Sequence, residues 1–271
     1  MLPVIASAAA AFRPISLTTL NGKAAMMERL DNKYILAEDR LLSALGVLSA
    51  SFDMLEISGK RAFTYSTRYF DDAELRNYYD HHQRRRKRGK VRVREYVDSG
   101  ASYLEVKLKE LRATTAKRRI EVNEPLVALD DPCLGFIDGC YRDSYDQPFL
   151  KPLKPVILIE YQRITLVAKD GGERLTIDAG LNFHSDGAHR AAPLDRFIIE
   201  TKSARGNGIA DKILRSLHVP PTKHASKYCM GMAATGQVSR RNGFLQALRR
   251  MGLDEPLKPA THILPSPIED F

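Results

Sequence analysis

The chain has 271 residues, of which 44% are hydrophobic and 28% are charged, as in an ordinary globular protein. Its formal net charge is +9 at pH 7, which indicates an anionic partner: nucleic acid, a membrane surface or a phosphate-rich small ligand. No apolar run approaches the roughly 20 residues that span a bilayer, so we expect no direct membrane insertion. The three cysteines form no CxxC pair and the first residues lack a basic signal segment, so we expect a cytoplasmic location.

Apolar spacing predicts both helices and strands in the first part of the chain. In chain order, we expect short helical pieces over 12–27, a strand over 28–36, a helix over 38–48, strands over 53–57 and 61–70, and a helix over 72–85. Ser16 and Asp72 are candidate N-caps, because their side-chain oxygens can accept hydrogen bonds from free backbone N–H groups.

Turn signals divide the rest of the chain into further elements. In chain order, we expect strands over 90–97, 102–110 and 114–121, an irregular helical region over 124–150, strands over 154–168, 173–184 and 196–203, and helices over 208–217, 224–234 and 238–252. The tail from Glu255 is rich in proline and is predicted to be unstructured.

Charged side chains recur at every second position of the predicted strands. Alternate residues of a strand point to the same face, so each of these strands has one charged face. The residues that follow this pattern are Arg92, Arg94, Glu105, Lys107, Arg163, Arg174, Asp178, Glu200 and Lys202. An ordinary half-buried sheet has an apolar inward face, whereas a closed barrel with a charged interior would explain the pattern. Its ligand would be a polyanion held together with a metal ion.

The basic surplus is concentrated between residues 84 and 94, which read RRRKRGKVRVR. We expect 84–88 to be surface residues, with a nucleic-acid patch as the alternative. Lys90, Arg92 and Arg94 alternate with valines and therefore share one face. At a spacing of about 7 Å and an effective dielectric of about 20, each neighbouring pair would repel by about 2 kcal/mol. Phosphate oxygens between them would reverse that sign, and the guanidinium fork suits phosphate.

Two weaker signals point to the same chemistry. The E-x-K pattern of Glu105 recurs at Glu200, and a carboxylate among cations is either a neutralising partner or a ligand for a hard cation. Ser226 and Lys227 open a predicted helix, where free N–H groups and a lysine can hold phosphate, unless they are an ordinary cap and a solvated lysine. The chain has no GxxxxGK[ST] or GxGxxG motif, which argues against a P-loop or Rossmann site.

Nine stretches, in the right order, resemble the VTC domain, the polyphosphate polymerase domain of the vacuolar transporter chaperone family, in its stand-alone bacterial form. The resemblance covers about residues 12–235. The stretches are RLDNKYIL (29–36), TRYFDD (67–72), KVRVREY (90–96), YLEVKLK (103–109), KRRI (117–120), EYQRITL (160–166), RLTID (174–178), IIETKS (198–203) and SKYCMGM (226–232).

The resemblance implies an α+β fold in which eight antiparallel strands close into a β tunnel, the triphosphate tunnel fold, with flanking helices. It implies transfer of the terminal phosphate of ATP onto a growing inorganic polyphosphate chain, with Mn²⁺ or Mg²⁺ as cofactor. The parts would be an N-terminal helical segment over 1–27, a tunnel domain over 28–235, and a C-terminal helix with a flexible tail over 236–271. A membrane-protein partner is compatible with the family, whereas nucleic acid is not expected.

The resemblance and the alternation pattern together assign roles to individual residues. The catalytic cations would be Lys33, Arg92, Arg94, Lys107, Arg163, Arg174 and Lys227. The substrate-binding residues would be Lys90, Arg119, Lys202, His224 and Ser226. Glu200 would be the principal metal ligand, with Glu105 as a helper.

Three features depart from the family pattern. The broader superfamily opens with E-x-E-x-K, whereas Arg29, Asp31 and Lys33 occupy those positions here, which weakens a hydrolase-type metal site. His224 lies two residues before Ser226, where the eukaryotic pattern has a lysine. There is no SPX-type region and no membrane segment, so the resemblance implies neither control by inositol pyrophosphates nor coupled translocation.

Three alternative functions stay open at this point. A hydrolase of the same fold would use water to cleave a triphosphate, and a non-catalytic module would bind polyphosphate or a nucleotide without turnover. A nucleic-acid-binding protein would use 84–94 and would need stacking aromatic residues beside that segment. Transfer to an already ionised polyphosphate end needs no general base, and the sequence contains no convincing candidate for one.

Overall fold

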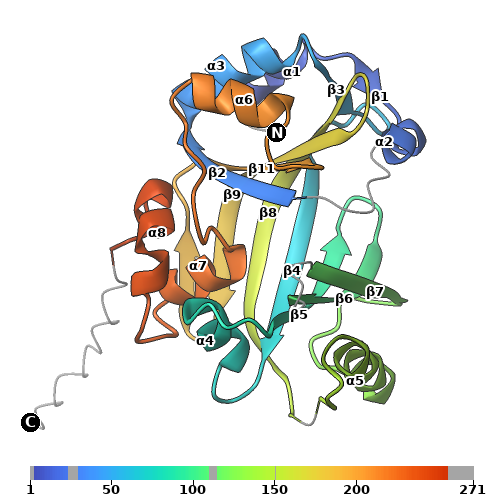
Figure 1. Cartoon of the computed structure of the whole chain (residues 1–271), viewed down its shortest axis with the longest axis vertical. Helices are drawn as coiled ribbons and strands as arrows, with labels where there is room; N and C mark the ends of the chain where they lie inside the picture. Colours follow the sequence, from blue (N-terminus) through green and yellow to red (C-terminus); the bar gives the residue numbers. More distant parts are fainter. Residues whose placement is uncertain (1–2, 24–29, 110–114, 150, 256–271) are drawn as a thin grey trace, which may run out of the picture.

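The computed structural model describes residues 3–23, 30–109, 115–149 and 151–255. At its centre, eight antiparallel strands follow one another in the order β2-β11-β9-β8-β4-β5-β6-β7 (Figure 1). Their bounds are β2 Leu30–Ala37, β11 Arg196–Ser203, β9 Glu173–Ser185, β8 Lys154–Ala168, β4 Phe63–Asp71, β5 Arg88–Tyr96, β6 Ala101–Lys109 and β7 Thr115–Val122.

Three short strands extend this sheet to 11 strands. They are β1 Pro14–Ile15, β3 Phe52–Leu55 and β10 Ala188–Ala191. β3 pairs with β8 and β10 pairs with β9, while β1 pairs with β3. Because β8 and β9 are 15 and 13 residues long, they extend beyond their neighbours and offer backbone groups for these additions.

The prediction of a closed eight-stranded barrel is wrong, because the sheet is open and has 11 strands. Within the described part of the chain, β2 and β7 share no hydrogen-bonded ladder. The sheet curls instead, and Lys107 Nζ on β6 lies 3.9 Å from the Asp31 carboxylate on β2. Among the described residues, this ion pair and not a backbone ladder connects β6 with β2.

Helices cover the sheet as separate layers (Figure 1). α1, α3 and α6 pack on the convex side of β2, β11, β9 and β8, where they form one apolar core. α5 packs in the same way against β5 and β6. The bounds are α1 Pro3–Ala9, α2 Leu17–Lys23, α3 Glu38–Leu48, α4 Arg76–His82, α5 Asp131–Tyr145, α6 Ile209–Ser216, α7 Lys227–Ala234 and α8 Leu245–Met251, with the 3-10 turn η1 at Asn242–Phe244. No helix among the described residues is long and apolar enough to cross a bilayer.

The predicted elements agree with the structure where their patterns are long. β8, β11 and α3 have the predicted bounds. The helical region expected over 124–150 contains only α5, and the helix expected over 238–252 is split into η1 and α8. β1 and β10 are too short for a detectable alternation and were not predicted. The strand start at 28–29 and the tail over 256–271 lie outside the described residues.

The two expected helix caps have different outcomes. Ser16 Oγ accepts a hydrogen bond from the N–H of Thr19, as predicted for a cap of α2. Asp72 is not the N-cap of α4, because that helix begins at Arg76 and is preceded by Leu75 in a left-handed conformation. The Asp72 carboxylate nevertheless accepts a hydrogen bond from the N–H of Arg76, the first residue of α4. It therefore stabilises the beginning of this helix from outside the cap position.

A bulge in β9 divides the concave face of the sheet into a charged half and an apolar half. The register between β8 and β9 shifts near Gly180, which has a φ of +60° that suits glycine. On one side of the shift, Asp178 faces Arg163 across the ladder. Beyond it, Phe183 pairs with Ile159, so apolar side chains take over the same face. The charged pattern therefore ends where β9 bulges.

α7 lies across this apolar half together with α8 and closes one end of the concave face. Gly231 of α7 packs so closely that an added Cβ would lie 2.6 Å from atoms of Ile157 and Phe183. The buried Asp71 carboxylate links β4, α4 and α7, since it accepts N–H groups of α4 and the hydroxyl of Tyr228, 2.5 Å away. α7 is thus held in one position relative to the strands.

We predict opposite effects for the same substitution in two helices. Gly231→Ala should lower the free energy of unfolding by about 1–3 kcal/mol, because the new methyl group overpacks the contact with β8 and β9. The matched control is Gly139→Ala in α5, where nothing lies within 4 Å. It should raise stability by up to about 1 kcal/mol, since alanine favours helix. Urea unfolding measures both, and equal stabilisation by the two changes would contradict the close packing of α7.

Candidate functional site

The charged half of the concave face gathers cations from seven strands and from α7. Cross-strand partners on this face include Lys90 with Lys107, Arg92 with Glu105, and Glu200 with Lys33. The predicted residues that share this face or its border with α7 are Lys33, Lys90, Arg92, Arg94, Glu105, Lys107, Arg119, Arg163, Arg174, Glu200, Lys202 and Lys227. The structure therefore brings together residues that are up to 194 positions apart in the chain, and cations outnumber carboxylates among them.

Glu105 neutralises the β5–β7 part of this face. Its side chain is 1% exposed, and one carboxylate oxygen lies 2.5 Å from Nη2 of Arg92 and 3.8 Å from Nη1 of Arg94. The other oxygen lies 2.5 Å from Nζ of Lys117. Burial alone would raise the pKa of Glu105, but the charges of Arg92, Arg94 and Lys117 hold that pKa far below its usual range. Glu105 is therefore a permanent anion.

Asp178 has the same role between β8, β9 and α7. Arg163 binds this fully buried carboxylate with two nitrogens, at 2.6 and 2.8 Å, and Lys227 donates a hydrogen bond to it. Burial opposes ionisation, but Arg163 and Lys227 together lower the pKa of Asp178 well below its usual value. The predicted alternative of a solvated Lys227 is wrong, since the ammonium group is turned inward and anchors α7 to the sheet.

Glu200 is the third carboxylate of the face. One oxygen lies 2.9 Å from Nζ of Lys202, and the other lies 4.0 Å from Nζ of Lys33. Although burial opposes it, the charges of Lys202, Lys33 and Lys107 hold the pKa of Glu200 well below the usual range. Its side chain is 16% exposed, so it is the most accessible of the three carboxylates.

Lys90 has no ion-pair partner among the described residues. Burial, followed by the charges of Lys33 and Lys107, lowers the pKa of its ammonium group to about 8. Cys229 of α7 and Tyr69 of β4 lie close enough to favour the charged form, but neither is ionised at neutral pH in the way a carboxylate is. The surroundings of Lys90 therefore lack the anion that an ionised lysine requires.

Tyrosines form a second layer on this face that the sequence analysis missed. Tyr69 accepts a hydrogen bond from Arg92 at 2.9 Å, and the neighbouring arginines lower the pKa of its hydroxyl to about 8 although burial would raise it. The guanidinium of Arg163 lies 5.1 and 5.3 Å from the ring centres of Tyr65 and Tyr161. The alternation of Tyr65, Thr67 and Tyr69 in one strand could have indicated that these tyrosines share the charged face. Lys117 alternates with Arg119 in the same way and was also missed.

Two of the predicted substrate-binding residues lie apart from the others. Ser226 Oγ accepts a hydrogen bond from the N–H of Cys229, so it acts as an ordinary N-cap of α7. His224 is exposed in the preceding loop with a φ of +60° and does not lie on the concave face. Their position at the beginning of α7 is next to the face, but the hydroxyl of Ser226 already has a partner.

The carboxylates fit a metal ion only in part. No group of three or more His, Cys, Asp or Glu side chains that could hold a metal occurs within the described residues. Glu105 does not fit as a ligand, because both its oxygens lie against cations. Glu200 fits as a single, partly exposed carboxylate, so phosphate oxygens of a ligand would have to supply most of the coordination, as is common for Mg²⁺.

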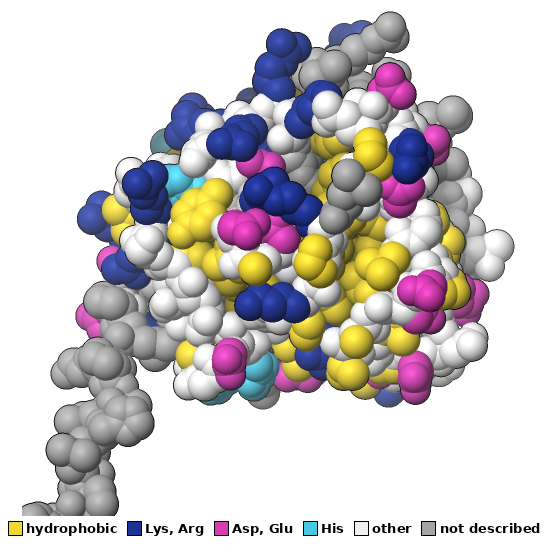
Figure 2. Space-filling model, turned by 90° about the horizontal axis from the view of Figure 1, so that it is seen from below, with side chains coloured by type: hydrophobic (Ala, Val, Ile, Leu, Met, Phe, Trp, Pro, Cys, Tyr) yellow, Lys and Arg dark blue, Asp and Glu magenta, His cyan; other side chains and the backbone are white. Residues whose placement is uncertain are grey.

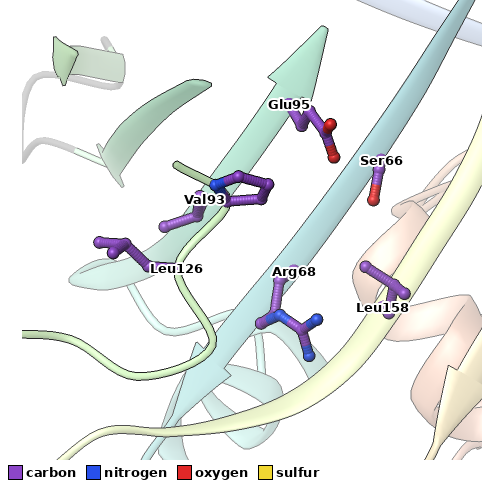
Figure 3. Close-up of a pocket in the computed structure, with 7 residues that line it drawn as sticks. Ser66, Arg68, Val93, Glu95, Leu126 and Leu158 are labelled. Atoms are coloured by element: carbon purple, nitrogen blue, oxygen red, sulfur yellow. The ribbon is translucent and has the colours of Figure 1, made fainter. Parts of the chain in front are cut away.

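A hollow on the opposite face is separate from this site. It has a volume of about 200 Å³ and lies between β4, β5, β8 and the segment at Pro125 (Figure 3). Ser66, Arg68 and Glu95 point into it from the convex side of the strands whose other side carries Arg92 and Arg94. It contains both charges and apolar side chains and shares no residue with the concave face.

The concave face can hold an extended polyanion, because its cations are fixed in advance by Glu105, Asp178 and Glu200. Guanidinium groups bind phosphate with two parallel hydrogen bonds, and lysines add point charges. The curled sheet excludes bulk water from one side of such a ligand, which strengthens each contact.

Solved structures with similar folds have low identity to the chain. A putative adenylyl cyclase, HpAC1 from Hippeastrum, whose structure is described as revealing a dominant triphosphatase activity, is 14% identical, with a TM-score of 0.48 and coverage of 80% of this chain and 99% of that one. A putative adenylate cyclase from Vibrio parahaemolyticus is 11% identical, with a TM-score of 0.43 and coverage of 75% and 97%. At these values, nothing about activity follows from the likeness.

A comparison with curated proteins finds no match for this chain. A family model does match, and it covers residues 28–129 and 141–235, which is most of the sequence and includes every strand of the charged face. This match confirms the family that the nine sequence stretches predicted. The chain belongs to the VTC domain family.

Proposed function

We propose that this protein is a polyphosphate polymerase that transfers the terminal phosphate of ATP onto a growing inorganic polyphosphate chain. The observation that carries the proposal is the surplus of fixed cations on the concave face, whose carboxylates already have cationic partners. A ligand that binds there must therefore bring its own negative charges. ATP and polyphosphate are linear polyanions, and both match this requirement.

Phosphoryl transfer requires alignment and charge neutralisation more than a protein nucleophile. Arg92 is held by Glu105 and Tyr69, and Arg163 by Asp178, so both guanidinium groups have fixed orientations. Fixed donors stabilise the charge of the transferred phosphoryl group without reorganising during the reaction. Lys33, Lys107 and the other cations of the face would align the two substrates in line, one on each side of that group.

The choice of a polymerase over a hydrolase rests on the acceptor. Water must lose a proton in the reaction, whereas the end of a polyphosphate chain is already ionised. Glu105, Asp178 and Glu200 are permanent anions with strongly lowered pKa values, so they are weak bases. Burial followed by the charge of Lys90 lowers the pKa of His81 to about 2, which makes this imidazole a weak base too.

A divalent cation, Mn²⁺ or Mg²⁺, belongs to the proposal as a cofactor. Glu200 would hold it together with phosphate oxygens of the ligand. The ion would supply further neutralisation of the charge on the transferred phosphate. The protein's own contribution would remain the orientation of both substrates by Arg92, Arg94, Arg163 and Lys227.

We predict that Arg92→Ala lowers the rate of polyphosphate synthesis from ATP by about 10²- to 10³-fold, as expected for a lost donor to the reacting phosphate. Product formation is followed by gel electrophoresis and phosphorus NMR. The matched control is Arg68→Ala on the convex side of β4, which should keep the rate. Near-normal synthesis by a folded Arg92→Ala protein would contradict the assigned site.

The same assay separates the polymerase from the hydrolase and from the non-catalytic module. Free phosphate without longer products would identify a hydrolase and overturn the polymerase. Intact ATP, together with measurable binding of ATP, would identify a non-catalytic module. Long polyphosphate and ADP from the wild type, lost on Glu200→Ala, would support both the reaction and the role of that carboxylate.

We also predict a pH dependence to which Lys90 contributes. Its pKa is lowered to about 8, so the cation that binds phosphate is present below that pH and is lost as the pH rises through it. The affinity for tripolyphosphate should therefore fall above about pH 8 in the wild type. In Lys90→Arg the decline should become weaker, since a guanidinium stays protonated, while Lys117 and Lys202, whose pKa values burial also lowers to about 8, still titrate. Calorimetric titration at several pH values tests this, and identical profiles would contradict it, because ionisation of the ligand is common to both proteins.

A further inference from the structure

The cations of the concave face continue to the surface at one end of the β5–β6 hairpin. Along the ladder, Lys90 pairs with Lys107, and two residues further out Arg88 pairs with Lys109. All four side chains lie on the same side of the hairpin, because they are separated by two positions in each strand. The charged face therefore does not stop inside the curled sheet.

Two loops add cations at the same end. The segment after α4 exposes Arg84, and the loop before α7 exposes Lys223 and His224. The helices that border these loops, α4 and α7, lie side by side, since the ring centres of Tyr78 and Tyr228 are 6.4 Å apart. Burial, together with the charges of Arg84, Lys223 and Arg88, lowers the pKa of His224. Figure 2, which views the molecule from below, shows Lys and Arg side chains gathered toward one side of that face. We call Arg84, Arg88, Lys109 and Lys223 the cationic rim.

Most of the rim charge is not neutralised by the protein. Within the described ranges, neither Arg84, Arg88 nor Lys223 forms an ion pair with a carboxylate. The neighbouring Arg85 differs, because it lies 3.2 Å from the Asp80 carboxylate. At the other end of the hairpin, Asp98 is paired with Lys60 at 2.9 Å, so the charges of these two residues cancel. The three rim cations that lack a carboxylate partner in the described ranges therefore distinguish the Arg88 end as the exit for a polyanion.

We propose that the cationic rim binds the part of a polyphosphate chain that has left the concave face, so that long chains are held more tightly than short ones. The inference rests on the proposed function and deepens it. Arg94 and Arg88 are six residues apart in β5, which corresponds to about 20 Å along a strand. A triphosphate held by Lys90, Arg92 and Arg94 is too short to extend also to Arg84 or Lys223, whereas a long chain can contact both regions at once.

Single-stranded nucleic acid fits the rim less well. Such ligands gain much of their affinity from bases stacked on exposed aromatic rings. The aromatic residues beside the rim include Tyr145, which is 8% exposed. Its hydroxyl donates to the carbonyl of Lys109 and accepts the N–H of Arg88. Its ring therefore supports the end of the hairpin and is not a free stacking surface. Polyphosphate, which has no bases, can be bound by cations alone.

The test compares short and long ligands on a variant of the rim. The double variant Arg84→Ala/Lys223→Ala removes two exposed cations that lie outside the proposed catalytic set. We expect it to bind tripolyphosphate within twofold of the wild type and to bind a long polyphosphate of defined length about 10-fold more weakly. The slope of log affinity against log salt for the long chain should fall by about 1.4, for two lost contacts to a single strand.

The control variant Lys212→Ala/Arg249→Ala removes the same charge from exposed positions on α6 and α8, and should leave both affinities unchanged. Unchanged affinity of the rim variant for long polyphosphate, with tripolyphosphate still bound by all proteins, would overturn the rim alone. Absence of tripolyphosphate binding to the wild type would instead overturn the proposed function. Tighter binding of single-stranded RNA than of polyphosphate of equal charge, lost in the rim variant, would replace this inference by a nucleic-acid site.

Discussion

Cations crowded onto one concave face repel one another, and the rest of the structure depends on how that repulsion is balanced. Three carboxylates provide the balance: the buried Glu105 for β5 to β7, the buried Asp178 for β8, β9 and α7, and the partly exposed Glu200 for β2 and β11. Each carboxylate lies on a strand next to the cations that it neutralises. Once the sheet has formed, the ion pairs therefore require little further loss of conformational entropy. Removing one of them would leave several buried cations without a partner, which is more costly than losing a single surface ion pair. The first role of the three carboxylates is thus to stabilise the fold, whatever part they have in a reaction.

The position of α7 follows from the same division of the face. The bulge at Gly180 ends the charged pattern of β9 and begins an apolar surface that includes Phe183, on which Gly231 of α7 packs closely. One end of the helix is thereby buried in an apolar core, while Lys227 at its other end is drawn to Asp178. The helix is fixed at both ends by different forces, dispersion at one and charge at the other. This arrangement places the beginning of α7 beside the cations without requiring that helix to be long.

Much of the face could be predicted from the sequence, because alternation is a local property of a strand. Arg92, Glu105 and Glu200 were assigned to one face from spacing alone, and the ladders place them there. The closed barrel was predicted wrongly, because closure depends on two edges that are distant in sequence and on the charges that face each other across the gap. The bulge at Gly180 was also beyond a pattern analysis, since one extra residue reverses the facing of every residue after it. Asp178 was recognised as part of the alternation, but its partner Lys227 belongs to a helix, and no spacing rule connects a strand to a helix 49 residues away.

The carboxylate partners are distributed unevenly along the concave face, so its two ends should attract a polyanion differently. Around Arg163 and Lys227, Asp178 neutralises part of the charge, and a ligand there would compete with Asp178 for the same donors. Lys90 and Arg88 have no carboxylate partner among the described residues, so a phosphate beside them gains the full attraction of these two cations. A polyanion that moves from the first region to the second exchanges shared donors for free ones. Repulsion among the cations requires carboxylates inside the curled sheet. Toward the surface, where the cations lack carboxylate partners, the same repulsion favours the passage of a negatively charged chain.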